Sequence, residues 1–155
     1  MSVITDPDYM PSFSEPTPSS ITDEARAFVA NFYRISDMQV EDEQWVEFFT
    51  GDAQVIMGED SGRGHCEIKE LRRRMWINVL ARKHQVLKVF TGAFSENSGT
   101  EGEFEYDMML LGRVQRTSQD SKTTIQIPWA SHMVLKKGPG REASQWKLAR
   151  YRVWL

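Results

Sequence analysis

The chain has 155 residues, one cysteine and a formal net charge of −3 at pH 7. This length predicts a single domain whose core is large enough to need no disulfide or metal staple. The weakly acidic balance argues against nucleic acid and against an anionic membrane as partners. A lone cysteine can form no internal disulfide, so we expect a cytoplasmic protein.

The first twenty residues differ in composition from the rest of the chain. They are rich in Pro, Ser and Thr and carry three acidic side chains. They lack the basic start and the apolar core of a signal peptide or membrane anchor. We expect a mobile arm over 1–20, followed by one domain over 21–155.

Three helices are predicted in the first half of the domain. Thr22 can cap the first helix, in which apolar residues recur at helical spacing. The other two show the same one-sided apolar pattern, and a short strand precedes the third. The expected ranges are 22–36, 41–50 and 64–81 for the helices and 52–57 for the strand, which a Gly-rich break over 58–64 ends.

Strand patterns dominate the second half. Apolar runs follow one another with short polar breaks, at 83–94, 106–114, 124–135 and 146–155, with turns at 95–102 and at 138–140. A chain that places its helices first and an antiparallel meander last belongs to the α+β class. We therefore expect a cone-shaped α+β barrel, with three N-terminal helices packed on a curved, mainly antiparallel sheet around a small-molecule pocket.

Several local segments point to a known family. An acidic stretch leads into Trp45 and 48–52, Gly-His-Cys-Glu-Ile opens the third helix at 64–68, and Arg-Lys-His at 82–84 precedes a strand that ends in Lys-Val-Phe at 88–90. With the element order, these segments resemble the nuclear transport factor 2-like superfamily over about residues 22–155. That superfamily includes ketosteroid isomerases, scytalone dehydratase and SnoaL-like polyketide cyclases. The resemblance is closest to small fungal members associated with natural-product pathways.

The resemblance implies that His84 is an acid/base catalyst. In a resembling dehydratase, a histidine at the start of the strand after the third helix lies in the pocket, where a near-neutral pKa allows proton transfer. The alternative is a surface histidine beside Arg82 and Lys83.

Two tyrosines are further catalytic candidates. Tyr106 shares its strand face with Met108 and other apolar residues, so it can donate a hydrogen bond to a carbonyl or enolate oxygen. A core tyrosine with a satisfied hydroxyl is the alternative. Tyr33 edges the apolar stripe at the end of the first helix, where the superfamily often places polar pocket residues. Arg34 points away and is a solvated charge unless the helix unwinds there.

The remaining pocket candidates are mostly apolar. On the strand over 124–135 we expect Trp129, Ser131 and Met133 to face the cone, and Ala130 and His132 to face outward. The expected substrate-binding residues are Trp45, Met57, Met75, Trp76, Met108, Trp129, Ser131, Met133 and Arg34.

A general base is not obvious. Small fungal relatives often carry an acidic residue immediately before the tryptophan of the penultimate strand, whereas here Pro128 precedes Trp129. This departure argues against carboxylate-driven isomerisation. A proline inside a strand also removes one ladder amide, which predicts an edge, a bulge or a bend.

No metal or cofactor motif is present. The three histidines are scattered, with no carboxylate at metal-ligand spacing. The Gly-rich segment over 58–64 lacks the lysine of a P-loop and the context of a dinucleotide fingerprint. The Arg72–Arg74 run reads as a solvated helix face.

Three functions are consistent with the sequence. The first is a cofactor-independent isomerase, cyclase or dehydratase that acts on a hydrophobic polycyclic natural-product intermediate. The second is a non-catalytic small-molecule binding protein, and the third is an interaction module whose pocket is filled by its own side chains. Because the long strands are apolar on both faces, we also expect a homodimer through the outer face of the sheet.

Overall fold

The computed structural model describes residues 7–12, 19–92, 104–137 and 145–155. The turns expected at 95–102 and 138–140 lie outside these residues. The elements, in chain order, are a 3-10 turn Pro7–Tyr9, α1 Ser19–Ser36, α2 Asp42–Val46, β1 Phe49–Met57, β2 Asp60–Arg63, α3 Gly64–Met75, β3 Val79–Thr91, β4 Phe104–Ser118, β5 Thr124–Lys137 and β6 Trp146–Trp154.

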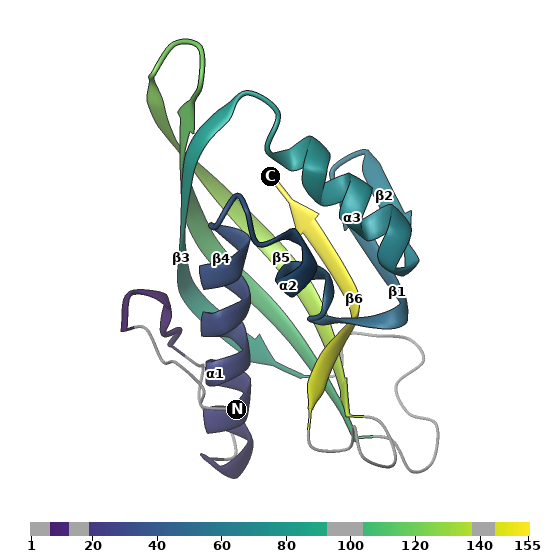
Figure 1. The fold of residues 1–155 in the computed structure, drawn as a ribbon. Coiled ribbons are helices and arrows are strands. Elements are labelled where there is room, and N and C mark those ends of the chain that lie inside the picture. The colour runs from purple at the N-terminus through teal and green to yellow at the C-terminus, as the bar shows by residue number, and fades with distance from the viewer. Residues whose placement is uncertain (1–6, 13–18, 93–103, 138–144) are drawn as a thin grey trace.

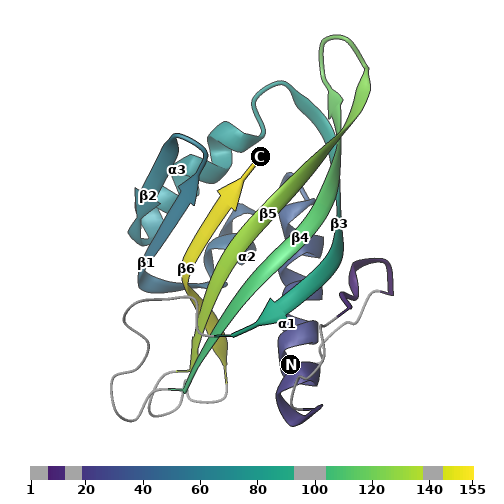
Figure 2. The ribbon, with the colours of Figure 1, turned by 180° about the vertical axis from the view of Figure 1, so that it is seen from behind.

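The strands form one curved, unclosed sheet in the order β2-β1-β6-β5-β4-β3. All neighbours are antiparallel except β1 and β6, which run parallel. Figure 1 shows the three α-helices on one side of this sheet, with α3 over β1 and β2 and α1 over the other end. Figure 2 shows the opposite side, which the helices leave uncovered. The predicted α+β cone is therefore confirmed.

The predicted alternation along β5 is also confirmed. Trp129, Ser131 and Met133 are buried beneath the helices, whereas Ala130 and His132 lie on the outer face and are more accessible. His132 Nε2 contacts the carboxylate of Asp107, which is also on that face. The strand register was thus predictable from the residue pattern alone.

Pro128 causes no register slip. It pairs with Arg113 of β4 in a continuous ladder, while the pairing of β5 with β6 begins only at Ala130. Pro128 therefore lies beyond the end of β6, where β5 has a free edge and a missing amide breaks no ladder on that side. The register shift between β5 and β6 lies instead at Val134 and Leu135, where the pairing passes over Ala149 of β6.

Several element boundaries differ from the prediction. The third helix was expected to reach residue 81 but ends at Met75, because Asn78 adopts a φ of 58° that turns the chain into β3. The second helix has only five residues, since β1 already begins at Phe49. The Gly-rich break forms the β1–β2 hairpin, in which Gly58 supplies a φ of 61°.

A short part of the N-terminal segment contacts the domain. Within the described residues 7–12, Tyr9 is buried against the domain and Ser12 accepts a hydrogen bond from the Val89 amide of β3 at 2.8 Å. The Lys83 ammonium lies 4.3 Å from the centroid of the Tyr9 ring. This part of the arm therefore packs on the domain beside β3.

The expectation that Arg72–Arg74 form a solvated helix face is wrong for Arg72. It follows Ile68 by one helical turn, so it shares the inward side of α3 and is fully buried. Its guanidinium bonds the carbonyls of Ile35, Ser36 and Met38 at the end of α1, and its Nε lies 2.7 Å from Asp42 Oδ1. Arg72 thus joins α3 to α1 and α2, whereas its two arginine neighbours are exposed.

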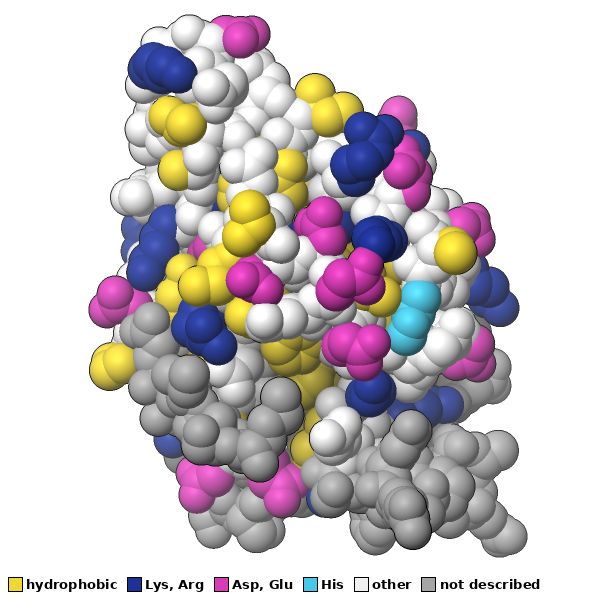
Figure 3. Space-filling model, viewed as in Figure 1, with side chains coloured by type: hydrophobic (Ala, Val, Ile, Leu, Met, Phe, Trp, Pro, Cys, Tyr) yellow, Lys and Arg dark blue, Asp and Glu magenta, His cyan; other side chains and the backbone are white. Residues whose placement is uncertain are grey.

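The helix-bearing surface has no strong electrostatic bias. In Figure 3, basic and acidic side chains are interspersed across this face, with apolar side chains between them. Several of the charges form surface ion pairs, such as Arg73 with Glu70. This mosaic lacks the basic stripe typical of a nucleic-acid-binding surface.

Candidate functional site

A cavity lies between the helices and the inner face of the sheet. Its own volume is about 50 Å³, and the space in and in front of it amounts to about 440 Å³ when open solvent is included. Apolar and aromatic side chains form most of its wall, and a few polar groups converge on it. The lining residues are Ser36, Trp45, Met57, Met75, Arg82, His84, Val114, Trp129, Tyr151, Val153 and Leu155.

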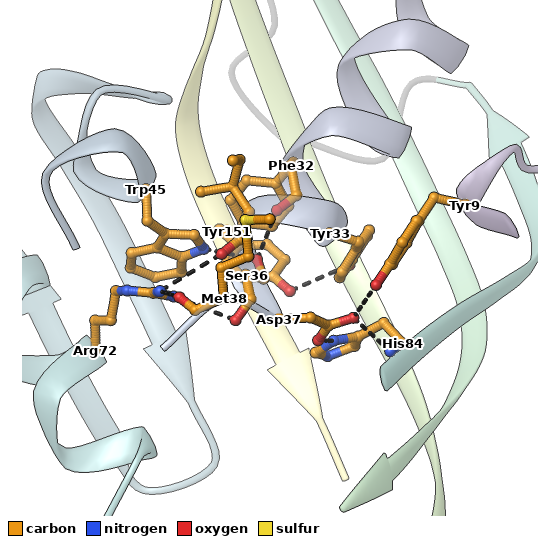
Figure 4. A network of polar contacts seen from close by, with 11 residues as sticks. Tyr9, Phe32, Tyr33, Ser36, Asp37, Met38, Trp45, Arg72, His84 and Tyr151 are labelled. Carbon is orange, nitrogen blue, oxygen red and sulfur yellow. Dashed lines mark hydrogen bonds and ion pairs between the residues drawn. The ribbon is translucent and has the colours of Figure 1, made fainter. Parts of the chain in front are cut away.

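His84 enters this cavity from β3 and is oriented by Asp37, the residue that follows α1. The imidazole Nδ1 lies 2.6 Å from Asp37 Oδ1, and the backbone amide of His84 donates to Asp37 Oδ2 at 2.8 Å. Tyr9 donates to the same Oδ2 at 2.8 Å. Figure 4 shows these three contacts converging on one carboxylate. Because Asp37 accepts at Nδ1, the other ring nitrogen is left for a ligand.

The electrostatic environment favours a neutral imidazole. Burial lowers the pKa of His84 below its ordinary value, and the Asp37 carboxylate opposes this shift without reversing it. At neutral pH, His84 therefore carries its proton on Nδ1, facing Asp37, and presents a basic Nε2. A neutral imidazole within a cavity wall can accept a proton from a bound molecule.

A chain of three hydroxyls lies beside the imidazole. The Tyr33 hydroxyl is 3.2 Å from Ser131 Oγ and 3.1 Å from the Tyr151 hydroxyl. All three residues are buried, and burial raises the pKa of both tyrosines, so their hydroxyls stay protonated at neutral pH. Of the three, Tyr151 lines the cavity. It can therefore donate a hydrogen bond to an oxygen of a ligand, with polarisation from the hydroxyls behind it.

The Tyr33 ring also supports the wall of the site. It stacks on Trp129 with a centroid distance of 5.1 Å and lies 5.0 Å from the imidazole of His84. On the opposite side, Trp45 donates from Nε1 to Ser36 Oγ at 2.7 Å. These contacts fix the aromatic side chains that face the cavity.

The structure places five of the predicted site residues in the cavity wall, namely His84, Trp45, Met57, Met75 and Trp129. Others are almost fully buried without lining it. Tyr33 and Ser131 belong to the hydroxyl chain of Tyr151, Met133 pairs with Tyr151, and Trp76 packs under Arg82, whereas Met108 lies further along β4. Whether any of these residues acts on a ligand stays a prediction.

Tyr106 and Arg34 are not brought to this cavity. Tyr106 is on the inner face, as predicted, but it lies eight residues along β4 from Val114, which is about 26 Å in a strand. There its ring packs against Trp146 with a centroid distance of 4.9 Å. Arg34 is half-buried in the last turn of α1 and is absent from the cavity wall.

Sequence reasoning missed Asp37, Arg82 and Tyr151. Asp37 stands at the exit of α1, where a carboxylate is indistinguishable from a solvated turn residue. Arg82 and Tyr151 lie among other charged or aromatic residues in their strands, so nothing in their immediate sequence distinguishes them. Two-residue alternation shows that they point inward only once the strand register is known. The signal available for Arg82 was its i, i+2 spacing from His84.

Metal-binding clusters and membrane-spanning helices are absent from the described residues. These residues contain no group of three or more His, Cys, Asp or Glu side chains that could hold a metal ion. None of the helices they form is long and apolar enough to cross a membrane.

Comparison with known proteins identifies the fold. No protein-family model and no curated protein matches the sequence. Solved structures match with high coverage and low identity. They include ActVI-ORFA from Streptomyces coelicolor, with a TM-score of 0.69, 13% identity, and 88% and 97% of the two chains covered. The hexachlorocyclohexane dehydrochlorinase LinA-type3 from Novosphingobium barchaimii has a TM-score of 0.68 and 10% identity, over 87% of this chain and 86% of that one.

A protein of the NTF2-like family from Streptomyces avermitilis also matches, with a TM-score of 0.66 and 11% identity over 88% of this chain and 96% of that one. These likenesses show that the chain has the nuclear transport factor 2-like fold, which the element order predicted. At such identities they show the fold alone, so the chemistry must be argued from the site.

Proposed function

We propose that this protein is a cofactor-independent enzyme that transfers protons on a hydrophobic small molecule, as an isomerase, dehydratase or cyclase does. The observation that carries the proposal is the pairing of His84 with Asp37 at the cavity wall. Asp37 fixes one imidazole nitrogen at 2.6 Å, and the second makes no hydrogen bond with the described residues. A buried histidine oriented in this way is the usual arrangement of a general base.

The geometry suggests a two-step reaction. Neutral His84 removes a proton from a carbon beside a carbonyl group, and the electron pair moves onto the carbonyl oxygen as an enolate. Tyr151 donates a hydrogen bond to that oxygen, while Asp37 stabilises the imidazolium. The imidazolium then returns the proton, either to another carbon, which gives an isomer, or to a leaving hydroxyl, which departs as water and gives an alkene.

The structural neighbours support an elimination or isomerisation chemistry. One of them is named as a hexachlorocyclohexane dehydrochlorinase, and loss of hydrogen chloride is an elimination. The apolar cavity wall favours a hydrophobic substrate, and we extend the proposal to a polycyclic natural-product intermediate in the cytoplasm. The second candidate is a non-catalytic small-molecule binding protein, which the proline in place of an acid before Trp129 favours.

The test compares two histidine variants. A panel of cyclic hydroxyketones and enones is incubated with the protein in deuterated water, and exchange, isomerisation or loss of water is followed by NMR. His84→Ala should lower the rate by roughly 10²- to 10⁴-fold. His132→Ala, on the outer face of the sheet, should leave it unchanged. Equal rates for His84→Ala and the wild type would remove His84 from the mechanism, and binding without any conversion would favour the second candidate.

The proposal includes a homodimer through the outer face of the sheet. Leu111, Ala130 and Trp154 form one row across β4, β5 and β6 on that face, and Phe90 lies in the next row. Leu111 and Trp154 are 47% and 40% exposed, which is unusual for large apolar side chains on a sheet. A second copy would cover them in a two-fold contact. Sedimentation at micromolar concentration should give twice the chain mass, and a monomer would contradict this.

A further inference from the structure

Arg82 makes no ion pair with a carboxylate in the described part of the chain, and the more distant charge of Asp37 favours its charged form. It lies two residues before His84 on β3, so both side chains project from the same face of the strand, and both line the cavity. Its guanidinium carbon lies 5.5 Å from the centroid of the Trp76 ring. No carboxylate of the described residues forms an ion pair with it. Asp37 bonds His84 and Tyr9 and acts on Arg82 only through its charge.

The polar atoms left without partners around this cavity are donors. Arg82 Nε and Trp129 Nε1 are buried and make no hydrogen bond, and Trp76 Nε1 under the guanidinium is also unpaired. By contrast, the cavity oxygens of Ser36 and Tyr151 already take part in hydrogen bonds. Buried polar groups are nearly always satisfied in native proteins, so unpaired donors indicate a missing acceptor.

A cation and an indole N–H in an apolar wall define the chemistry of that acceptor. Burial lowers the pKa of Arg82, because the charged form lacks full solvation, yet arginine stays protonated at neutral pH. An anion would replace the missing solvation. The planar guanidinium matches the two oxygens of a carboxylate, and the adjoining wall of Met57, Met75 and Val114 suits an apolar body.

We propose that the cavity takes its substrate as a hydrophobic carboxylate, whose anionic head binds Arg82 and accepts from Trp129 while the apolar body lies against the methionine-rich wall. This inference rests on the proposed function, because it names the substrate class of the same site. With the head on Arg82, the carbons next to the carboxylate come towards His84, two residues further along the strand.

The experiment measures binding, so it does not depend on turnover. Naphthalene-2-carboxylate and benzoate are titrated into the full chain by calorimetry at pH 7, beside the matched primary amides, which keep the shape and lose the charge. We expect each acid to bind about tenfold to a hundredfold more tightly than its amide, the difference usual for a hydrogen-bonded charge. Arg82→Met, which keeps the stem over Trp76, should remove that preference. Arg82→Lys should keep part of it.

Arg113→Gln is the matched control, since it removes one exposed arginine from the outer face of the same sheet. It should leave both affinities unchanged. The comparison of acid with amide on the wild-type protein needs no variant and stands even if Arg82→Met fails to fold. Equal binding of acid and amide, or no binding of either acid at millimolar concentration, would overturn the proposal.

The two proposals can fail separately. Preferential binding of the acids that depends on Arg82, together with no proton transfer on any tested compound, would retain the carboxylate site and reject the enzyme. Proton transfer that depends on His84 but is indifferent to Arg82 and to the charge of the substrate would do the reverse.

Discussion

Removal of the Asp37 carboxylate should destabilise the protein and change the protonation of His84. The carboxylate accepts three hydrogen bonds, from His84 Nδ1 at 2.6 Å, from the His84 amide at 2.8 Å and from Tyr9 at 2.8 Å. Its side chain is only 5% exposed. Water therefore cannot easily replace it, and truncation leaves three donors without a partner.

The size of the effect follows from those donors. Each buried donor left unpaired costs roughly 1–3 kcal/mol, so the loss of one acceptor for three donors costs several kcal/mol. We expect Asp37→Ala to lower the free energy of unfolding by about 4 kcal/mol. With a urea slope of about 2 kcal/mol/M, the unfolding midpoint should move down by about 2 M.

Asp37→Asn should destabilise the protein less than Asp37→Ala does, but it should remove the ability of His84 to act as a base. Its amide keeps one acceptor oxygen and presents an NH₂ group to Nδ1, so the imidazole proton moves to Nε2 and the nitrogen that faces the ligand can no longer accept a proton. The pKa of His84 should fall further, because the carboxylate that favours the imidazolium is gone. Nitrogen-15 NMR of the histidine ring distinguishes the two tautomers.

Asp52→Asn serves as the control, since Asp52 is an exposed strand residue whose one side-chain bond within the described residues comes from Thr50. Its free energy of unfolding should stay within about 0.5 kcal/mol of the wild type. The reasoning fails if Asp37→Ala is as stable as Asp52→Asn, or if the His84 ring keeps its Nδ1 proton in Asp37→Asn.

Three further predictions concern stability. Because burial lowers the pKa of His84, the contribution of this residue to the free energy of unfolding is complete above its ordinary pKa of about 6.5 and is lost as the pH falls below that value. Urea unfolding from about pH 7.5 down to pH 5 should show this decline in stability. In His84→Gln the decline should be smaller. Gly112→Ala should cost about 1–3 kcal/mol, since the added methyl overlaps the Trp129 ring, and a thermal midpoint equal to the wild type would argue against that packing. Arg72→Met should lower the free energy of unfolding by about 3 kcal/mol in the same urea assay, because carbonyl groups at the end of α1 lose their hydrogen-bond donor. The exposed Arg73→Met should lower it by less than about 0.5 kcal/mol. Equal losses would contradict the buried role of Arg72.

The sequence predicted the fold well because the fold depends on periodic patterns. The two-residue alternation of Trp129, Ser131 and Met133 fixed one face of β5, and the structure has those side chains inside. Helix ends were harder to predict. The apolar spacing over 64–81 continued through Val79, although the chain had already turned at Asn78 and entered β3. Periodicity cannot distinguish a helix from the start of a buried strand over so few residues.

The site was harder to predict because its key contacts join distant positions. Asp37 and His84 are 47 residues apart, and nothing local to Asp37 marks it as a partner. Arg72 shows the same difficulty, since two exposed arginines follow it and its burial depends on α1 ending beside α3. Aromatic wall residues such as Trp45 were easier, because large apolar side chains go inside in almost any arrangement.

The position of β6 has a consequence for how the protein folds. This strand comes last in the sequence but lies inside the sheet, between β1 and β5, and it pairs Val55 with Tyr151 across 151 − 55 = 96 positions. Such distant pairing must wait for much of the chain to collapse, which slows folding. Until β6 docks, β1 and β5 each expose an unpaired edge that a neighbouring chain could join. Refolding at high concentration should therefore favour aggregation, and chains trapped in that state would lack Tyr151 and Val153 from the cavity wall.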